Sequence, residues 1–373
     1  MVYAKNTDIM TKKSKSSILL IGIFTILLVS SMYVAQDAEA AKSKGTSLPE
    51  TGSKKVCGDR LCSEITKEQG DSSAETETET QQQQETESTE EETTAQSFTV
   101  NNFVGNLYLF TEAGYNSLFI PTGEGVVVFD APNSSGSNLV DAIADITDEP
   151  ITHVVYSHGH KDHIGAAHYF PDDAVIIAQE QTKTWLEKSA DPDRPIPTVV
   201  FSDDYTLELG NTVVELSYKG PVHSNGNIFF YIPEYKTLFL VDHAHPGWVP
   251  WWSLGGSTDV RAYIDGHDWI LDYDFDYFVP GHGEIGDRED VLLIQEYVLD
   301  LKEKAMTAIQ TVDFAEATKG VSSEGYNMTD AYFEALADKC AQLSDDEWRD
   351  KLIGTDTWTE TSCMKMIMSI FGD

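Results

Sequence analysis

The sequence predicts a mixed α/β (α+β) fold with two β-sheets in layers and a helical C-terminal extension. Short apolar stretches bounded by Gly and Pro recur between residues 106 and 241, which is typical of strands. Stretches with helical spacing separate some of these strands, and from residue 291 onwards the pattern is helical. Of the 373 residues 41% are apolar, enough for a packed core. Such an order of elements indicates layered sheets covered by helices.

The expected elements follow in order along the folded part, which begins near Phe98. We expect strands at residues 106–110, 117–120, 125–130, 152–156, 175–178, 198–201, 212–216, 227–232 and 237–241. We expect helices at residues 139–146, 181–188, 260–272, 291–310, 330–343, 345–352 and 360–371. Ser344 and Glu347 have the spacing of a capping box at the start of the helix 345–352.

The acidity of the chain belongs mainly to its folded part. The chain has 25 Lys and Arg against 62 Asp and Glu, a formal net charge of −37. Residues 1–96 hold 10 basic and 16 acidic side chains, which leaves 15 basic and 46 acidic, a net charge of −31, for the rest. Such a surface repels a polyanion, so we expect no nucleic-acid partner.

Residues 1–40 have the pattern of a secretory signal. Lysines at positions 12, 13 and 15 precede an apolar run at residues 18–29, and the tripeptide Ala38-Glu39-Ala40 fits an A-x-A cleavage site. The alternative is a retained membrane anchor, although about 17 residues, roughly 26 Å of helix, fall slightly short of a bilayer core of about 30 Å. In both cases we expect an extracytoplasmic protein, secreted or tethered to the outer face of the cell membrane through this segment alone.

Residues 41–97 combine a short cysteine-bearing segment with a predicted disordered linker. Residues 64–96 are almost all Glu, Thr, Ser and Gln and include 11 acidic residues, too few apolar groups to offset the entropy of ordering. Four cysteines fit an oxidising compartment. Of three connectivities we favour Cys57–Cys62 with Cys340–Cys363, because each pair closes a local loop. A four-cysteine zinc site is the less favoured alternative, since the C-x4-C spacing is wide for one.

One motif carries the chemistry. The run Ser157-His158-Gly159-His160-Lys161-Asp162-His163 follows the expected strand 152–156. Side chains two apart in an extended loop face the same way, so His158 and His160 can bind one ion. Asp162 and His163 lie at a loop-to-helix turn and can face a second ion. Imidazole and carboxylate are ligands that zinc accepts, and this density favours a metal site over a chance surface cluster.

This H-x-H-x-D-H pattern after a strand resembles the metallo-β-lactamase superfamily. The resemblance implies further ligands at strand ends, and matching residues are His223 in Pro221-Val222-His223-Ser224, Asp242 after the strand 237–241, and His282 in Gly281-His282-Gly283. It covers residues 100–283, about half the chain. It implies a four-layer αββα sandwich for residues 98–290, beside which residues 291–373 are the helical C-terminal extension.

The resemblance also implies the arrangement of the metal ions. Two Zn²⁺ ions per chain are expected, with iron or manganese as alternatives; the first is bound by His158, His160 and His223, the second by Asp162, His163 and His282, and both by the bridging Asp242. A metal-bridging hydroxide is then the expected nucleophile, because zinc lowers the pKa of bound water to about 7. Asp162 is expected to act catalytically as well, by accepting a proton from the water.

Five other histidines are weighed separately. We expect His153 to be structural, His168 to pack on its helix and His267 to lie on the surface. His243 and His245 closely follow Asp242 and open an aromatic loop that runs to Trp252. We predict that His245 has a substrate or proton-transfer role. The alternatives for the loop are a rim packed by tryptophans or a hydrophobic lid that selects an apolar acyl or ring substrate.

The function that follows is hydrolysis of an ester, lactone or related acyl bond in a small molecule. The β-lactamase branches usually lack the bridging aspartate, and RNA-processing members need a basic surface. The alternatives are a β-lactamase-like or phosphodiester hydrolase, a mononuclear iron dioxygenase acting on persulfides, and a non-catalytic surface-binding module. We expect the C-terminal helices to cap the active-site edge or to form a dimerisation surface, which leaves the oligomeric state open.

Overall fold

The computed structural model describes residues 56–57, 60–61 and 98–372. The chain divides into two units, Met1–Glu90 and Glu91–Asp373. In the first unit, β1 (Val56–Cys57) pairs with β2 (Arg60–Leu61) in an antiparallel hairpin. The expected signal or anchor and the linker fall on residues outside those described, and so does Cys62 of the expected Cys57–Cys62 pairing. None of the helices in the described part of the chain combines the length and apolar character needed to cross a membrane.

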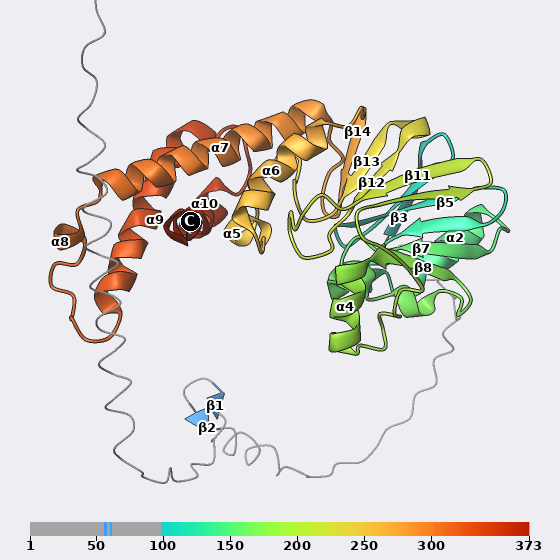
Figure 1. Cartoon of the computed structure of the whole chain (residues 1–373), viewed down its shortest axis with the longest axis horizontal. Coiled ribbons are helices and arrows are strands. Elements are labelled where there is room, and N and C mark those ends of the chain that lie inside the picture. The colour runs from blue at the N-terminus through green and yellow to red at the C-terminus, as the bar shows by residue number, and fades with distance from the viewer. Residues whose placement is uncertain (1–55, 58–59, 62–97, 373) are drawn as a thin grey trace, which may run out of the picture. The chain divides into compact units, whose positions relative to one another are not determined.

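The second unit contains two sheets (Figure 1). The larger has seven strands in chain order, antiparallel from the first to the fourth and parallel from there on. They are β3 (Phe98–Val104), β4 (Leu107–Glu112), β5 (Tyr115–Pro121), β6 (Val126–Phe129), β7 (Ile151–Val155), β8 (Val175–Gln179) and β9 (Val199–Phe201). Parallel strands require crossovers, and the segments with α2 and α3 supply two of them.

The smaller sheet has five strands, also in chain order. They are β10 (Asp204–Leu209), β11 (Thr212–Ser217), β12 (Phe229–Ile232), β13 (Thr237–Leu240) and β14 (Tyr277–Pro280). All neighbours are antiparallel except β13 and β14, which run parallel. The carboxyl ends of β13 and β14 therefore lie together, and each is followed by one of the expected ligands.

Nine α-helices and three short 3-10 turns occur in the described residues. The helices are α2 (Asn138–Ile146), α3 (Lys161–Ile164), α4 (Glu180–Ser189), α5 (Trp252–Gly255), α6 (Val260–Leu271), α7 (Arg288–Thr311), α8 (Phe314–Ala317), α9 (Asn327–Trp348) and α10 (Thr355–Gly372). The turns are η2 (Asn133–Ser135), η3 (Ala167–Tyr169) and η4 (Pro233–Tyr235).

The hydrophobic cores define four layers. Between the sheets, Phe129 of β6 meets Phe230 of β12 edge to face, with ring centroids 5.7 Å apart. On the outer face of the larger sheet, α2 buries Leu139 and Ile143. On the outer face of the smaller sheet, Phe278 shares a core with the apolar faces of α6 and α7. The expected αββα architecture with a helical C-terminal region is therefore confirmed.

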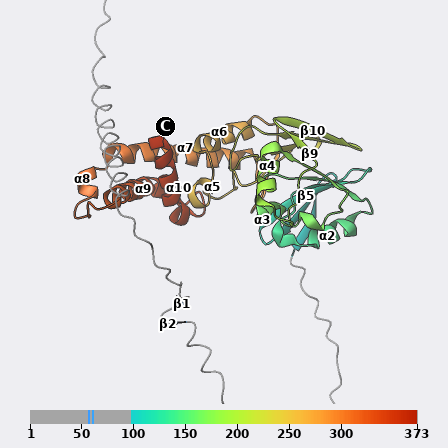
Figure 2. The same ribbon diagram turned by 60° about the horizontal axis from the view of Figure 1, so that its bottom comes forward.

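The C-terminal helices continue that last core. Figure 2 shows α7, α9 and α10 gathered to one side of the sheets. Trp348 of α9 is buried edge-on against Tyr297 of α7, 5.3 Å between ring centroids. The predicted disulfide Cys340–Cys363 is present and links α9 to α10.

Some expected elements were wrong or missing. Residues 330–343 and 345–352 do not form two helices, because α9 runs unbroken to Trp348 and Ser344 is buried in it, donating its hydroxyl to the Cys340 carbonyl at 3.2 Å. The expected capping box at Ser344 and Glu347 is therefore wrong. A capping box instead opens α7, at Asp287 and Asp290. The strands β3, β10 and β14 went unpredicted, because the first two alternate in exposure at sheet edges and the third is short and ends in Pro.

Candidate metal centre

The H-x-H-x-D-H motif occupies the turn from β7 into α3. His160 has extended dihedral angles and directly precedes α3, which contains Asp162 and His163. The change from extended to helical backbone at this point directs His158 and His160 differently from Asp162 and His163. Two buried contacts fix this turn: Ser157 donates its backbone N–H to Asp130 Oδ1 at 2.7 Å, and Arg194 donates from Nη1 to the Gly159 carbonyl at 2.7 Å. The motif is thus held from both sides, by a carboxylate and by a guanidinium.

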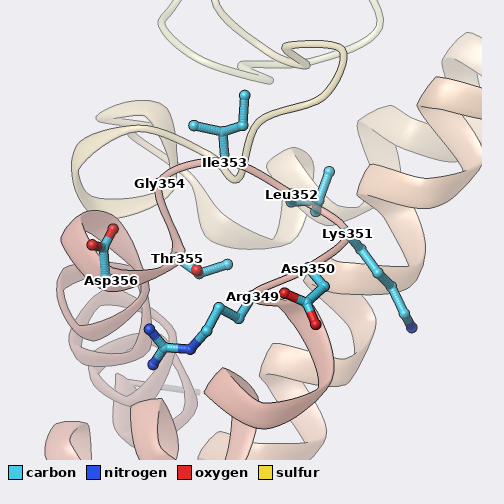
Figure 3. A pocket seen from close by; sticks show the side chains of 8 residues that line it. All are labelled: Arg349, Asp350, Lys351, Leu352, Ile353, Gly354, Thr355 and Asp356. Carbon is cyan, nitrogen blue, oxygen red and sulfur yellow. The ribbon is translucent and has the colours of Figure 1, made fainter.

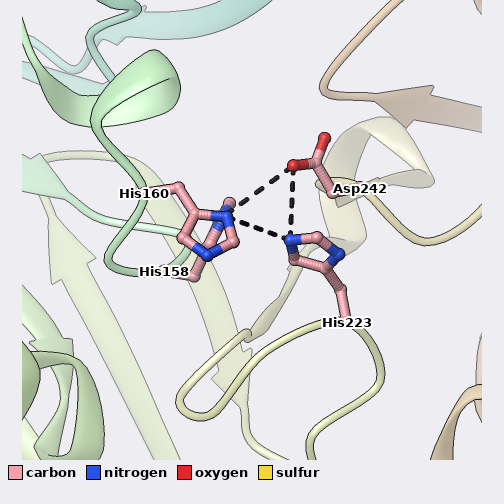
Figure 4. A group of neighbouring side chains, drawn as sticks. All are labelled: His158, His160, His223 and Asp242. Atoms are coloured by element: carbon pink, nitrogen blue, oxygen red, sulfur yellow. Dashed lines mark hydrogen bonds and ion pairs between the residues drawn. The ribbon is translucent and has the colours of Figure 1, made fainter. Parts of the chain in front are cut away.

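The structure brings the first expected ligand set together. His158, His160, His223 and Asp242 point toward one another (Figure 4), and their ligand atoms lie within 4.8 Å of one another. His223 Nε2 is 3.1 Å from His160 Nδ1 and 3.5 Å from Asp242 Oδ2. Several imidazole nitrogens and one carboxylate oxygen around one point are a donor set that suits a divalent zinc ion.

The second expected set converges on the same aspartate. Asp162, His163, Asp242 and His282 also offer ligand atoms within 4.8 Å of one another. His163 Nε2 lies 3.0 Å from Asp242 Oδ2, and His282 Nε2 lies 3.2 Å from Asp242 Oδ1. Asp242 therefore belongs to both clusters. Its backbone has a positive φ of 60°, which directs the carboxylate from the end of β13 into the site.

Outer contacts orient the imidazoles. His223 donates from Nδ1 to the Gly255 carbonyl at 2.7 Å, so Nε2 carries the lone pair that faces the cluster. Ser157 Oγ lies 2.9 Å from His158 Nδ1, which leaves His158 Nε2 toward the site. That buried Nε2 has no hydrogen-bond partner among the described residues. A buried nitrogen without a partner, aimed at three other ligands, fits a bound ion.

The electrostatics match this reading. Burial lowers the pKa of His158, His160 and His223, so all three are neutral near pH 7. Burial also opposes charge on His163, but the carboxylates of Asp242 and Asp162 outweigh it and raise the pKa of His163 to about 9. For Asp242 burial raises the pKa, and the contact with His163 overcomes this and holds it well below its usual value. A divalent cation bound here would take the place of the proton on His163.

The second predicted catalytic residue, His245, lies beside the site. Its ring centroid is 6.1 Å from that of His282, and burial lowers its pKa to about 4. Neither ring nitrogen has a hydrogen-bond partner within the described part of the chain. His243 instead faces the core, with its ring 4.5 Å from that of His267.

The expectation for His267 is wrong. It is fully buried on α6 rather than on the surface. Val260, Tyr263 and Ile270 lie on the same helical face and are also buried, so the spacing already contained this signal. The two remaining histidines outside the expected ligand set are His153 and His168. His153 is half-buried in β7, and His168 is exposed with Nδ1 3.1 Å from the Gly165 carbonyl.

Sequence reasoning missed several residues around the site. Tyr115 packs on His282 with ring centroids 4.3 Å apart. Asn116 donates from Nδ2 to the carbonyls of Pro280 and Gly283, at 3.0 and 2.9 Å, and so fixes the loop that carries His282. Trp185 lies edge-on to His160, 6.3 Å between ring centroids, and supports the Arg194 guanidinium at 4.8 Å from its ring centroid. The burial of Arg194 is visible only in the structure, so no signal in the sequence pointed to it.

Comparison with known proteins decides the family. Residues 111–282, which contain all seven expected ligands, match the Metallo-beta-lactamase superfamily. Residues 111–282 therefore belong to the metallo-β-lactamase superfamily. The expected enzyme class, a metal-dependent hydrolase of this fold, is confirmed at the level of that superfamily.

Similar proteins align with about half of the chain. The 2,4-dinitroanisole O-demethylase subunit alpha of Nocardioides sp. (strain JS1661) is 26% identical over 191 residues, which are 50% of this chain and 58% of the relative. A type 2 metallo-beta-lactamase of Bacillus sp. (strain 170) is 25% identical over 213 residues, 52% of this chain and 79% of the relative. The chain thus spans little more than half the length of the demethylase subunit.

A solved structure resembles more of the chain. A variant of the sec-alkyl sulfatase PisA1 superimposes with a TM-score of 0.55 at 14% identity, covering 74% of this chain and 50% of that one. At this identity the likeness concerns the fold alone. The covered share exceeds the segment that matches the superfamily, so the shared fold extends beyond residues 111–282.

Proposed function

We propose that this chain is an exported dinuclear zinc hydrolase that cleaves an ester, lactone or related acyl bond of a small molecule. The observation that carries the proposal is the shared aspartate: Asp242 Oδ2 lies 3.0 Å from His163 Nε2 and 3.5 Å from His223 Nε2. One carboxylate that reaches both clusters suits two ions held close together. A single-ion site would leave His163 and His282 without a purpose in the chemistry.

The donor set supports zinc. His158, His160, His223 and Asp242 would hold one ion, and Asp162, His163, His282 and Asp242 the other. When bound, two such ions supply a nucleophile derived from water at neutral pH and polarise the substrate oxygen. The chain contributes by keeping three imidazoles neutral and by fixing the His223 tautomer through Gly255.

Three side chains at the site can move or hold protons. The Asp162 side chain is 44% exposed, so its carboxylate can accept a proton and pass it to solvent. The neutral His245 imidazole carries one N–H that can donate a hydrogen bond to a leaving group. Burial and the nearby Asp162 and Asp242 raise the pKa of Tyr115, so its hydroxyl stays protonated and can donate a hydrogen bond to substrate.

Exposed tryptophans support a substrate with an apolar part. Trp185 stands beside His160, and Trp251 and Trp252 are exposed in the loop that follows Asp242. Aromatic faces around a polar centre bind an acyl chain or a ring while the centre engages the reacting bond. The names of the relatives add an aryl methyl ether and a β-lactam to the bonds worth testing.

The test combines metal content with a substrate panel. We expect about two zinc ions per chain by elemental analysis, and turnover of lactones or esters ahead of thioesters, phosphodiesters, a sulfate ester, an aryl ether and a cephalosporin. Asp242→Asn should abolish turnover while the fold is retained. Asp287→Asn, which keeps a capping residue at the start of α7, is the matched control and should behave as wild type.

Each other outcome changes the proposal. About one iron per chain would favour oxygen-dependent sulfur chemistry. Turnover of the cephalosporin alone would favour a β-lactamase. A chain that binds no metal, or an Asp242→Asn variant with full turnover, would refute the two-ion hydrolase.

The proposed export rests on two features. Residues 1–40 have the basic, apolar and A-x-A pattern of a secretory signal, and the disulfide Cys340–Cys363 suits an oxidising compartment. Cell fractionation and N-terminal sequencing test it. We expect the protein in the medium with a new N-terminus after Ala40, or on the outer membrane face with the segment intact. A full-length, reduced protein in the cytoplasm would refute export.

A further inference from the structure

In the segment after the bridging aspartate, the short element α5 (Trp252–Gly255) is a left-handed turn rather than a right-handed helix. Trp252, Ser253 and Leu254 have φ values of 23°, 60° and 56°, and Gly255 and Gly256 continue at 62° and 64°. The turn is closed by the N–H groups of Gly255 and Gly256, which donate to the carbonyls of Trp251 and Trp252 at 2.7 and 3.0 Å. Three successive residues with side chains rarely adopt this conformation, and they keep it only where their surroundings enforce it.

The C-terminal helix α10 supplies that enforcement. The Ser253 N–H donates to Thr361 Oγ1 and the Leu254 N–H donates to Ser362 Oγ, both at 3.1 Å. Ser362 and Leu254 are fully buried, so the second of these bonds is shielded from water. Without the Ser362 hydroxyl, a buried N–H would lose its partner.

The left-handed turn also positions a metal ligand. Its Gly255 carbonyl accepts the 2.7 Å hydrogen bond from His223 Nδ1. A side-chain carbon at Gly255 would lie 3.3 Å from the backbone carbonyl of Asp242, so the turn also lies against the bridging ligand. Two residues of the first metal cluster therefore rest on a turn whose amides are held by α10.

A second contact fixes the start of the same segment. In the connector between α9 and α10, Ile353 accepts from the Val249 N–H at 3.0 Å and donates to the Gly247 carbonyl at 2.9 Å. Figure 3 shows Ile353 and Gly354 on this connector, beside a surface hollow of about 340 Å³ lined by residues 349–356. The disulfide Cys340–Cys363 joins both helices next to Ser362. The C-terminal helices thus hold the segment 247–256 at both ends.

We propose that the C-terminal helices position the metal centre, with Thr361 and Ser362 as positioning residues that act on His223 through the left-handed turn. The effect acts through His223, which belongs to the first cluster alone; the shared Asp242 is also held by His163 and His282 of the second cluster. The second cluster has other supports, since the His163 carbonyl accepts from the Ala131 N–H at 2.8 Å and Asn116 fixes the loop of His282. This inference rests on the metal centre but on no particular substrate.

The test is stepwise metal binding by the chelator-stripped full chain. Titration with Co²⁺, followed by its visible absorption and by chelator competition, gives an affinity for each of the two sites. His223→Ala and His282→Ala assign the two steps. We expect Ser362→Ala and Thr361→Val to weaken the site that contains His223 by about tenfold or more and to leave the other unchanged, in line with losses when an outer partner of a ligand is removed. Thr361→Ser, which keeps the hydroxyl, should retain wild-type affinity.

A matched control separates positioning from general loss of stability. Thr359 lies on the same helix, is buried, and shares its hydroxyl with Tyr297 Oη at 2.9 Å rather than with the turn. Thr359→Val should lower the unfolding temperature and leave both Co²⁺ affinities unchanged. Equal weakening of both sites by Ser362→Ala and Thr359→Val, or unchanged affinity in Ser362→Ala, would overturn the proposal. A wild-type chain that binds no Co²⁺ would refute the metal centre itself and the positioning role with it.

Discussion

Acidification should destabilise the fold in part through a buried histidine outside the metal centre, His267. It donates from Nδ1 to the Tyr263 carbonyl at 3.1 Å, and its Nε2 has no hydrogen-bond partner in residues 98–372. Burial lowers its pKa to about 4, and the hydrogen bonds to the Ile264 and Tyr263 carbonyls, with the nearby Asp268, oppose this only in part. The ring packed against it, His243, is also held neutral because burial places its pKa well below the ordinary value.

The sign and size follow from the two pKa values. Above pH 6.5 His267 is neutral in the folded and the unfolded chain and contributes no pH dependence. As the pH falls, the unfolded chain binds a proton near pH 6.5 and the folded chain only near pH 4, so stability is lost between these values. The total loss is about 3 kcal/mol, since each pKa unit corresponds to about 1.4 kcal/mol.

Urea unfolding of metal-stripped protein measures this loss. His267→Phe keeps an aromatic ring between His243 and Tyr263 but cannot titrate. Between pH 7.5 and 4.5 the wild type should lose about 2.5 kcal/mol more unfolding free energy than the variant. His168→Phe, at an exposed histidine, is the control and should follow the wild type. Parallel pH curves for wild type and His267→Phe would refute the reasoning.

Three further predictions concern the supports of the site and the fold. Arg194 donates from Nη1 to the Gly159 carbonyl while Nε and Nη2 contact Asp191, an arrangement that Lys cannot reproduce. The bond to the carbonyl is charge-assisted and worth about 1.5–3 kcal/mol, so Arg194→Lys should weaken zinc binding at least tenfold in chelator competition; unchanged affinity would contradict this. Asn116→Ala removes two hydrogen bonds to the loop of His282 and should weaken the second ion selectively, by about 1–2 kcal/mol, in the Co²⁺ titration; an effect on the first ion alone would count against it. Replacing Cys340 and Cys363 together by Ala opens a loop with a sequence separation of 23 and should lower the unfolding free energy in urea by roughly 3 kcal/mol, whereas equal stability would show that the disulfide contributes nothing.

The ligand positions could be predicted because their chemistry is local. His158, His160, Asp162 and His163 fall within six residues, and Asp242 closely follows an apolar run that is visible in one sequence. His223 and His282 were assigned through the resemblance, because His223 lies in the loop between β11 and β12 and the strand before His282 went unpredicted. Their supports were invisible for a physical reason. The groups that orient His158, His160 and His223 include backbone carbonyls and partners that lie 35 or 108 residues away in the chain. Every residue has a backbone carbonyl, so composition and spacing cannot show which carbonyl orients a ligand.

The secondary structure shows the same division. Elements with a strong period, such as α2, α4, α6 and the central strands, lie within a few residues of their expected bounds. The failures occur where tertiary contacts override local signals. Ser344 resembles a helix start, yet in the fold it is a buried position inside α9, whose hydroxyl bonds the carbonyl one turn back. His267 resembles a surface residue only when its polarity is considered without the face of α6 on which it lies.

The left-handed turn explains why the segment that matches the superfamily does not define the whole site. Trp252, Ser253 and Leu254 at positive φ cost about 1–2 kcal/mol each, or roughly 3–6 kcal/mol together. The two hydrogen bonds to α10 contribute about 1 kcal/mol each, and burial of the Leu254 side chain contributes about 2 kcal/mol. These terms nearly balance, so the turn is stable only while α10 lies beside it. The seven ligands lie within residues 111–282, but the hydroxyls that hold the carbonyl against His223 come from Thr361 and Ser362. The C-terminal helices are therefore part of the metal centre in the physical sense that its geometry depends on them.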